Sequence, residues 1–187
     1  MALDRRVRRT RFAIHRALMD LMLEKGYEAV TVTEIIDRAD IGRSTFYAHY
    51  TDKRDVLYAS LDELAGFLRA HRDDGEGLFG FSLAMFEHAH EQRLLIRALL
   101  GRRGGTVVRD RIAYVIGELV REQLVAHNPA PAIPLDLLVA GVVGAYMALL
   151  ARWADGDEPH TPAQLDAAFR QLVTPGVAAA LGPGRPG

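Results

Sequence analysis

Apolar residues recur at intervals of three and four along most of this chain, which is the period of an α-helix. In the first such stretch, Ile14, Leu18 and Leu21 share one helix face. Nowhere do apolar and polar residues alternate with a period of two for long enough to predict a sheet. The sequence therefore predicts an all-α fold. Beyond residue 52, amphipathic helices are predicted over 53–71, 78–90, 92–101, 105–127, 134–154 and 162–173.

The first fifty residues carry signals for three helices. The first helix is expected to stop at Lys25-Gly26, because a cation in the last turn followed by glycine is a common helix ending. Thr31 and Glu34 match a capping box, so a short second helix is expected to begin there and to end near Ala39. After the turn "ADIG", a third helix is predicted over residues 43–50. Two short helices joined by a tight turn are the layout of a helix-turn-helix.

The third helix has the side chains that a DNA major groove requires. Arg43, Ser44 and Thr45 fall in its first turn, from which a recognition helix contacts base edges. Tyr47 lies four residues after Arg43 and so shares its face. His49, Tyr50 and Lys53 are predicted to hydrogen-bond phosphates, and Phe46, on the opposite side, is predicted to be core. These residues predict binding to double-stranded DNA.

The stretch "TVTEIIDRADIGRSTFYAHYTDKRDVL", with "RRTRFAIHRALMDLMLEKGYEAV" before it, resembles the N-terminal domain of the TetR/AcrR transcriptional regulators. The resemblance covers about residues 8 to 60 and weakens afterwards. It implies that Arg43, Ser44 and Tyr47 approach bases. It also implies that the DNA backbone is held by the following residues: Thr33, Thr45, His49, Tyr50 and Lys53.

Two positions depart from the usual pattern of that family. Asp40 stands in the turn where members usually have glycine, and Gly42 stands at the third-helix cap where many have serine. Aspartate tolerates the left-handed conformation better than most residues, and glycine is an acceptable N-cap. The fold is expected to survive both changes, whereas Gly42 removes one hydroxyl that could contact a phosphate.

The distribution of charge also favours a front module that meets a polyanion. The whole chain has 23 basic and 24 acidic residues, but residues 1–54 have 11 and 8, and the remainder has 12 and 16. The run "RRVRR" contains Arg5, Arg6, Arg8 and Arg9, which form either a solvated face or a surface along a phosphate strand.

The domains expected are 1–52 for DNA binding, 53–181 for regulation and dimerisation, and 182–187 as a disordered tail, with "DDGEG" (73–77) as a break.

The second domain is expected to form a homodimer, because one short helix reads too few bases, and the family resemblance implies the same. The apolar 134–154 helix and the last helix are the predicted contact; the alternative is that both are core of one subunit. The predicted interface residues are Ala140, Gly144, Met147, Ala148, Ala151, Phe169 and Leu172.

The resemblance further implies a small-molecule effector pocket among the middle helices. Its candidate lining is Phe79, Met85, His88, Leu99, Ile112, Ile116 and Tyr146, all of which would serve equally well as ordinary core or satisfied polar residues. An effector bound there would shift the protein toward a conformer with wrongly spaced reading heads. The resemblance implies a repressor.

No catalytic motif is found, so we expect no enzymatic activity, no cofactor and no metal. In "EHAHE" (87–91), His88 and His90 are two residues apart and point to different sides of a helix.

The chain lacks cysteine and a visible signal peptide, and its most apolar run, residues 137–151, is shorter than a membrane span. We therefore expect a cytoplasmic protein without a membrane partner. The alternative function is a helical interaction or ligand-carrier protein that does not bind DNA.

Overall fold

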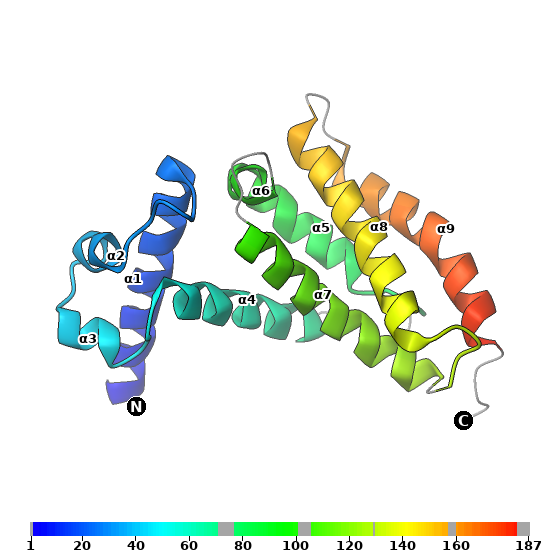
Figure 1. Cartoon of the computed structure of the whole chain (residues 1–187), viewed down its shortest axis with the longest axis horizontal. Helices are drawn as coiled ribbons and strands as arrows, with labels where there is room; N and C mark the ends of the chain where they lie inside the picture. Colours follow the sequence, from blue (N-terminus) through cyan, green and yellow to red (C-terminus); the bar gives the residue numbers. More distant parts are fainter. Residues whose placement is uncertain (1, 71–76, 101–105, 129, 157–159, 183–187) are drawn as a thin grey trace. The chain divides into compact units, whose positions relative to one another are not determined.

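Every regular element in the described part of the chain is an α-helix, as the apolar spacing predicts. This computed structural model describes residues 2–70, 77–100, 106–128, 130–156 and 160–182. Figure 1 shows the helices in chain order. Their bounds are α1 Ala2–Lys25, α2 Val32–Arg38, α3 Arg43–Tyr47, α4 Lys53–Ala70, α5 Ser82–Glu91, α6 Arg93–Leu100, α7 Thr106–His127, α8 Leu135–Asp155 and α9 Pro162–Leu181.

The chain divides into two compact units that do not follow chain order. Unit 1 consists of residues 1–63 and 94–111, and unit 2 consists of residues 64–93 and 112–187. The break expected at residues 73–77 and the tail expected at 182–187 fall almost entirely outside the described residues. The boundary expected between residues 52 and 53 stays a prediction.

In unit 1, α1 supplies a buried face against which α2 and α3 pack. Ile14 and Leu18 of α1, Ile35 of α2 and Phe46 of α3 are all fully buried, which confirms Phe46 as core. At about 25 cal/mol per Å² of apolar surface removed from water, each such side chain contributes roughly 1.5–3 kcal/mol. This small core holds the two short helices, which are too short to be stable alone.

The turn between α2 and α3 has the hydrogen bonds of a Schellman motif. The amide of Ile41 donates to the carbonyl of Ile36 at 3.2 Å, and the amide of Asp40 donates to Asp37 at 3.2 Å. This geometry requires a left-handed residue, and Asp40 has φ of 51°. The expectation that Asp40 tolerates the left-handed conformation is therefore confirmed. The helix α3 is shorter than predicted, because its last turn tightens at residues 48–50, where the amide of His49 donates to Phe46 at 2.9 Å.

In unit 2, α9 packs against α5 and α8 around an aromatic cluster. The rings of Phe86 and Tyr146 lie 4.6 Å apart, and Phe169 of α9 lies 5.6 Å from Tyr146 and 5.6 Å from Phe79. The helix α9 continues past residue 173, its predicted end, and passes through Pro175. Burial of Val177, Ala180 and Leu181 offsets the hydrogen bond that proline removes.

By length and composition alone, α8 is the one helix in the described residues that could cross a membrane. The core helix of a soluble protein passes the same test. Tyr146, Leu150 and Trp153 of α8 are buried inside unit 2, and the helix packs along α9. This packing is the expected arrangement of a core helix.

Candidate nucleic-acid interface

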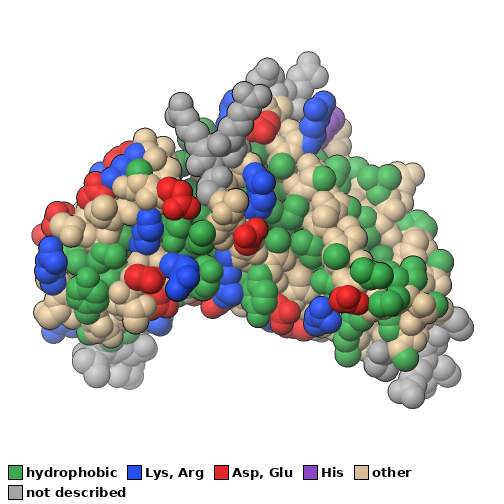
Figure 2. All heavy atoms as spheres, viewed as in Figure 1, with side chains coloured by type: hydrophobic (Ala, Val, Ile, Leu, Met, Phe, Trp, Pro, Cys, Tyr) green, Lys and Arg blue, Asp and Glu red, His purple; other side chains and the backbone are tan. Residues whose placement is uncertain are grey.

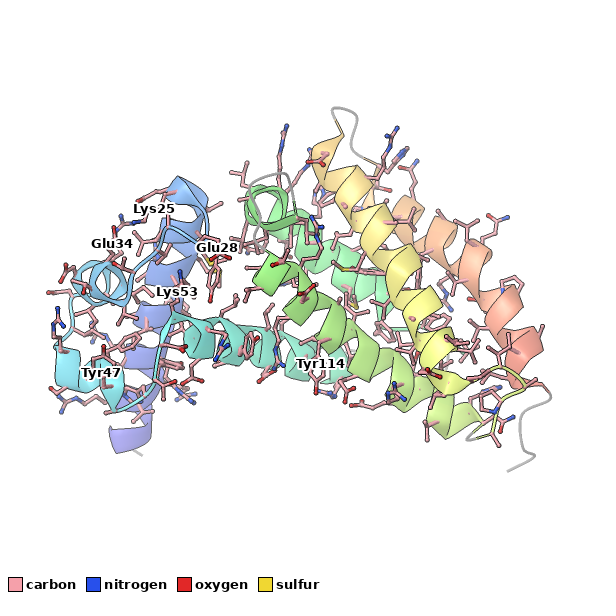
Figure 3. All side chains as sticks on the ribbon, viewed as in Figure 1. Lys25, Glu28, Glu34, Tyr47, Lys53 and Tyr114 are labelled. Atoms are coloured by element: carbon pink, nitrogen blue, oxygen red, sulfur yellow. The ribbon has the colours of Figure 1, made fainter. Side chains whose placement is uncertain are left out.

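The outer face of α3 presents the predicted base-contacting side chains to solvent. Arg43, Ser44 and Tyr47 are exposed, and the Tyr47 side chain is 56% exposed although it is large and partly apolar. The Tyr47 ring is held edge-on against Phe46, with centroids 5.3 Å apart and planes at 86°. Figure 3 shows Tyr47 on α3. The core residue Phe46 thus orients a tyrosine whose hydroxyl is free to reach a partner.

A contact between α2 and α3 extends this face. The guanidinium of Arg43 donates to the hydroxyl of Thr33 at 3.4 Å, and both side chains are exposed. Thr45 and His49 are half-buried. We call Thr33, Arg43, Ser44 and Tyr47 the reading face. An Arg beside hydroxyl groups on an exposed helix is chemically suited to the acceptor atoms of guanine and to phosphate oxygens.

Tyr50 has a different role from the phosphate contact predicted for it. Its side chain is 3% exposed, and its hydroxyl lies 2.6 Å from Nε2 of His15 on α1. Burial raises the pKa of Tyr50, so the hydroxyl keeps its proton. The tyrosine therefore ties the end of α3 to α1. Sequence reasoning missed His15, because its partner is 35 residues away and no local pattern indicates the pair.

Lys53 also differs from its prediction. Its ammonium group donates to the carbonyls of Tyr27, Glu28 and Val30 at 3.0, 3.0 and 2.9 Å, and it lies 4.6 Å from the centre of the Tyr27 ring. An ammonium group has three donors, and all three are used here. Figure 3 shows Lys53 at the start of α4 near Glu28. Lys53 fastens α4 to the loop between α1 and α2 and has no donor left for a phosphate.

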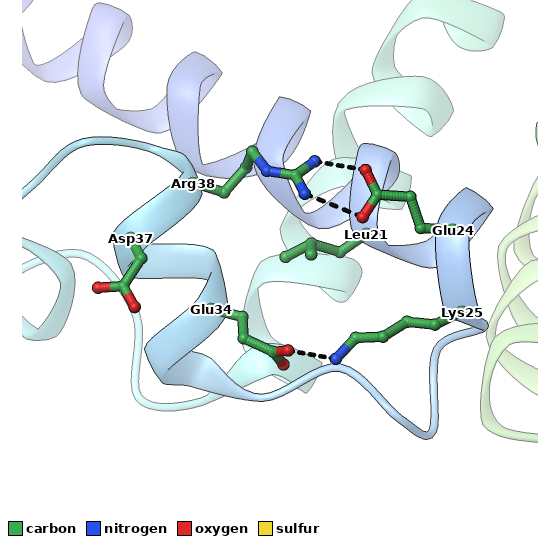
Figure 4. A pocket seen from close by; sticks show the side chains of 6 residues that line it. All are labelled: Leu21, Glu24, Lys25, Glu34, Asp37 and Arg38. Atoms are coloured by element: carbon green, nitrogen blue, oxygen red, sulfur yellow. Dashed lines mark hydrogen bonds and ion pairs between the residues drawn. The ribbon is translucent and has the colours of Figure 1, made fainter.

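A shallow pocket between α1 and α2 is lined by paired charges (Figure 4). Arg38 donates to both carboxylate oxygens of Glu24 at 2.8 and 2.9 Å, and Lys25 pairs with Glu34. The hydrogen bonds from Lys25 and Thr31 hold the pKa of Glu34 down to about 2. Thr31 and Glu34 also form the predicted capping box, with the Thr31 amide 2.9 Å from the carboxylate. These groups satisfy one another and position α2 on α1.

The comparisons with known proteins agree on this module. Residues 14–59 match the family model of bacterial regulatory proteins of the tetR family. Over these residues the chain is similar to the TetR family. It is 28% identical over 183 residues to an uncharacterized HTH-type transcriptional regulator, YxbF, from Bacillus subtilis (strain 168), a match that covers 91% of this chain and 46% of that protein. The chain spans less than half the length of the curated relatives it matches.

Solved structures share the fold over nearly the whole chain. A TetR transcriptional regulator from Streptococcus agalactiae 2603V superimposes with a TM-score of 0.69 at 24% identity, covering 92% of this chain and 98% of that one. Thermus thermophilus FadR, a TetR-family repressor in complex with lauroyl-CoA, gives a TM-score of 0.58 at 22% identity, covering 95% of this chain and 100% of that one. At these identities the likeness establishes the fold.

The predicted effector-pocket residues of this chain do not all belong to one unit. Leu99 belongs to unit 1, and the other six belong to unit 2. Of those six, Phe79 and Tyr146 both contact Phe169 in the aromatic cluster, and Met85 and Ile116 are buried. His88 and Ile112 are half-buried. Burial lowers the pKa of His88, opposed by Glu91, so a neutral imidazole is expected at pH 7.

The predicted dimer residues divide into exposed and buried groups. Ala140, Gly144, Ala148 and Leu172 are exposed, the last at 71%, and Met147 and Ala151 are half-buried. Phe169 corrects the prediction, because it is 1% exposed and packs inside the aromatic cluster of its own chain. Figure 2 shows apolar side chains gathered over the α8 side of unit 2 in this view.

The described residues contain no metal-binding cluster. No group of three or more His, Asp or Glu side chains there could hold an ion. His90 of "EHAHE" instead lies beside Trp153, with ring centroids 5.9 Å apart.

Proposed function

We propose that this chain is a sequence-specific DNA-binding transcriptional regulator that works as a homodimer on a near-palindromic operator. The observation that carries the proposal is the reading face, an exposed Arg43 and Tyr47 on a helix whose opposite side is fixed by Phe46. The charge of the front module supports it, since residues 1–54 have 11 basic and 8 acidic residues. The similarity to the TetR family supports the same conclusion.

The roles of individual residues follow from their surroundings. Arg43 and Tyr47 contact base edges, with Ser44 beside them. Thr33, Thr45 and His49 hold the sugar-phosphate backbone, and hydrogen bonds of this kind fix the register of the helix on the duplex. Tyr50 and Lys53 act indirectly, because their polar atoms hold α3 and α4 in place.

The dimer is proposed to form through α8 and α9. Ala140, Gly144 and Ala148 recur every four residues and are exposed, and a Cβ built on Gly144 meets no atom within 4 Å. Small residues allow helices to approach closely, and the exposed Leu172 of α9 adds apolar area. Two copies joined there would present two α3 helices to successive major grooves, about 34–36 Å apart or a multiple of that distance.

A small-molecule effector is proposed to bind in unit 2 and release the DNA, so that the chain acts as a repressor. We propose that this repressor works in the cytoplasm and is not an enzyme. The aromatic cluster would face an apolar ligand, and His88 would provide a polar contact. The similar T. thermophilus repressor has lauroyl-CoA bound, which supports an acyl-type ligand. A ligand that binds one conformer better lowers DNA affinity by its differential binding energy.

The test is fluorescence anisotropy on DNA flanking the protein's own gene and on scrambled DNA, across a salt series. We expect preference for the specific site by about a thousandfold or more, and the double variant Arg43→Ala/Tyr47→Ala should lose that preference while keeping the fold. The matched control is Arg97→Ala, which removes an exposed arginine of α6. A helical carrier protein that does not bind DNA would give no binding even at low salt and no difference between the variants.

A further inference from the structure

The first turns of α1 extend beyond the core of unit 1 as a basic helix. Among the side chains of α1 whose burial is described, which begin at residue 5, Ile14 is the first that is buried, and Val7, Thr10 and Ala13 are half-buried. Arg5, Arg6, Arg8 and Arg9 are all exposed there. A helical stretch that buries so little gains little stability from tertiary packing, so its exposed residues can serve another purpose.

Three of these arginines share one side of α1. Arg5 and Arg8 are three residues apart, and Arg5 and Arg9 are four apart, so the three side chains are neighbours on the helix surface. Within the described residues, none of the three has an acidic partner within 4 Å. Like charges at this spacing repel one another slightly, and an anion placed beside the cluster would remove that repulsion.

Contacts within unit 1 place this cluster next to α3. The imidazole of His15 contacts the Tyr50 hydroxyl, and the Arg11 guanidinium lies 5.8 Å from the centre of the Tyr50 ring. Arg8 precedes Arg11 by three residues, so it lies one turn farther along α1 on the side that faces the end of α3. The basic cluster therefore lies on α1 next to the contact that joins α1 to the end of α3.

We propose that Arg5, Arg8 and Arg9 form a second, sequence-independent contact with DNA, on phosphates next to those bound by α2 and α3. This inference rests on the proposed function and adds a surface to it. Three guanidinium groups per protomer would release counterions from the duplex and raise affinity for every sequence alike. Base selectivity would stay with Arg43 and Tyr47.

An anionic membrane is the other polyanion that a basic helix can meet. Phe12 is 67% exposed, but it is the only large apolar side chain exposed between residues 5 and 16. An interfacial helix needs a broad apolar face opposite its charges. The surroundings of the cluster thus favour DNA.

The experiment compares the wild-type dimer with Arg5→Gln/Arg8→Gln/Arg9→Gln and with the matched variant Arg5→Lys/Arg8→Lys/Arg9→Lys. Anisotropy is measured across a salt series on operator and scrambled duplexes. Each duplex either ends at the edge of the half-sites or runs about ten base pairs, one helical turn, farther. Binding to vesicles of phosphatidylserine and phosphatidylcholine is measured in parallel, and urea unfolding confirms that each variant is folded.

We expect the glutamine variant to lose affinity equally on both sequences and to have a shallower salt slope, by up to about 0.9 per arginine removed, or roughly five for a dimer. The lysine variant should keep the wild-type slope, and the difference should be largest on the longer duplexes. An unchanged salt slope in the glutamine variant overturns the inference, as does loss of vesicle binding with DNA binding intact. Failure of the wild type to bind any DNA would instead contradict the proposed function itself.

Discussion

At the scale of single residues, Lys53 shows how a side chain typical of a DNA contact can serve the fold. Its three donors fasten α4 to the carbonyls of Tyr27, Glu28 and Val30. Lys53→Met should therefore destabilise the protein by about 2 kcal/mol, since hydrogen bonds from charged groups are each worth about 1.5–3 kcal/mol and water partly replaces them. Urea unfolding measures this loss. The control Arg54→Met, at an exposed neighbouring residue, should change the free energy of unfolding little. An unchanged stability with weakened DNA binding would restore the phosphate role.

His15 makes the stability of unit 1 depend on pH. Burial lowers the pKa of His15, Glu63 raises it and Arg11 lowers it, with burial the largest cause. The folded state therefore resists protonation, and its stability should be complete above the unfolded pKa of about 6.5 and decline as the pH falls below it. Unfolding free energies at pH 8 and pH 5 measure the decline, which His15→Gln should make shallower. Equal pH dependence of both proteins would contradict this assignment.

At the scale of elements, the exposed stripe on α8 is the feature that makes a dimer possible. A Cβ on Gly144 has open space, so Gly144→Arg fits within one protomer but would block a partner helix. We expect Gly144→Arg to sediment as a monomer at micromolar concentration, with unchanged helical content. Gly66→Arg on α4, whose Cβ also meets no atom within 4 Å, is the matched control and should stay dimeric. A dimeric Gly144→Arg would place the interface elsewhere.

The same scale shows what could be predicted from the sequence. The capping box of Thr31 and Glu34 and the left-handed Asp40 were predictable because they depend on neighbours within a few residues. The end of α9 was not, because Pro175 is a strong local stop signal and only the burial of Val177 and Leu181 in unit 2 overrides it. The roles of Tyr50 and Phe169 were likewise hidden, since both depend on partners far away in the chain.

At the scale of the whole molecule, we propose a regulator with a reading face on α3, a dimer surface on α8 and α9, and an effector site in unit 2. Affinity and selectivity are assigned to different residues: basic side chains of α1 attract any DNA, and Arg43 and Tyr47 choose the sequence. Because selectivity belongs to so few side chains in each protomer, changing one of them should alter the preferred sequence in both half-sites symmetrically.

The most direct test is selection of bound duplexes from a randomised DNA pool, followed by sequencing, for the wild type and for Arg43→Ala. The wild type should enrich an inverted repeat, and Arg43→Ala should lose the preference at one position in each half, where a bidentate arginine contact with guanine is worth about 1–3 kcal/mol. A pool without any enriched sequence, or the same motif from both proteins, would contradict the claim that this face reads DNA.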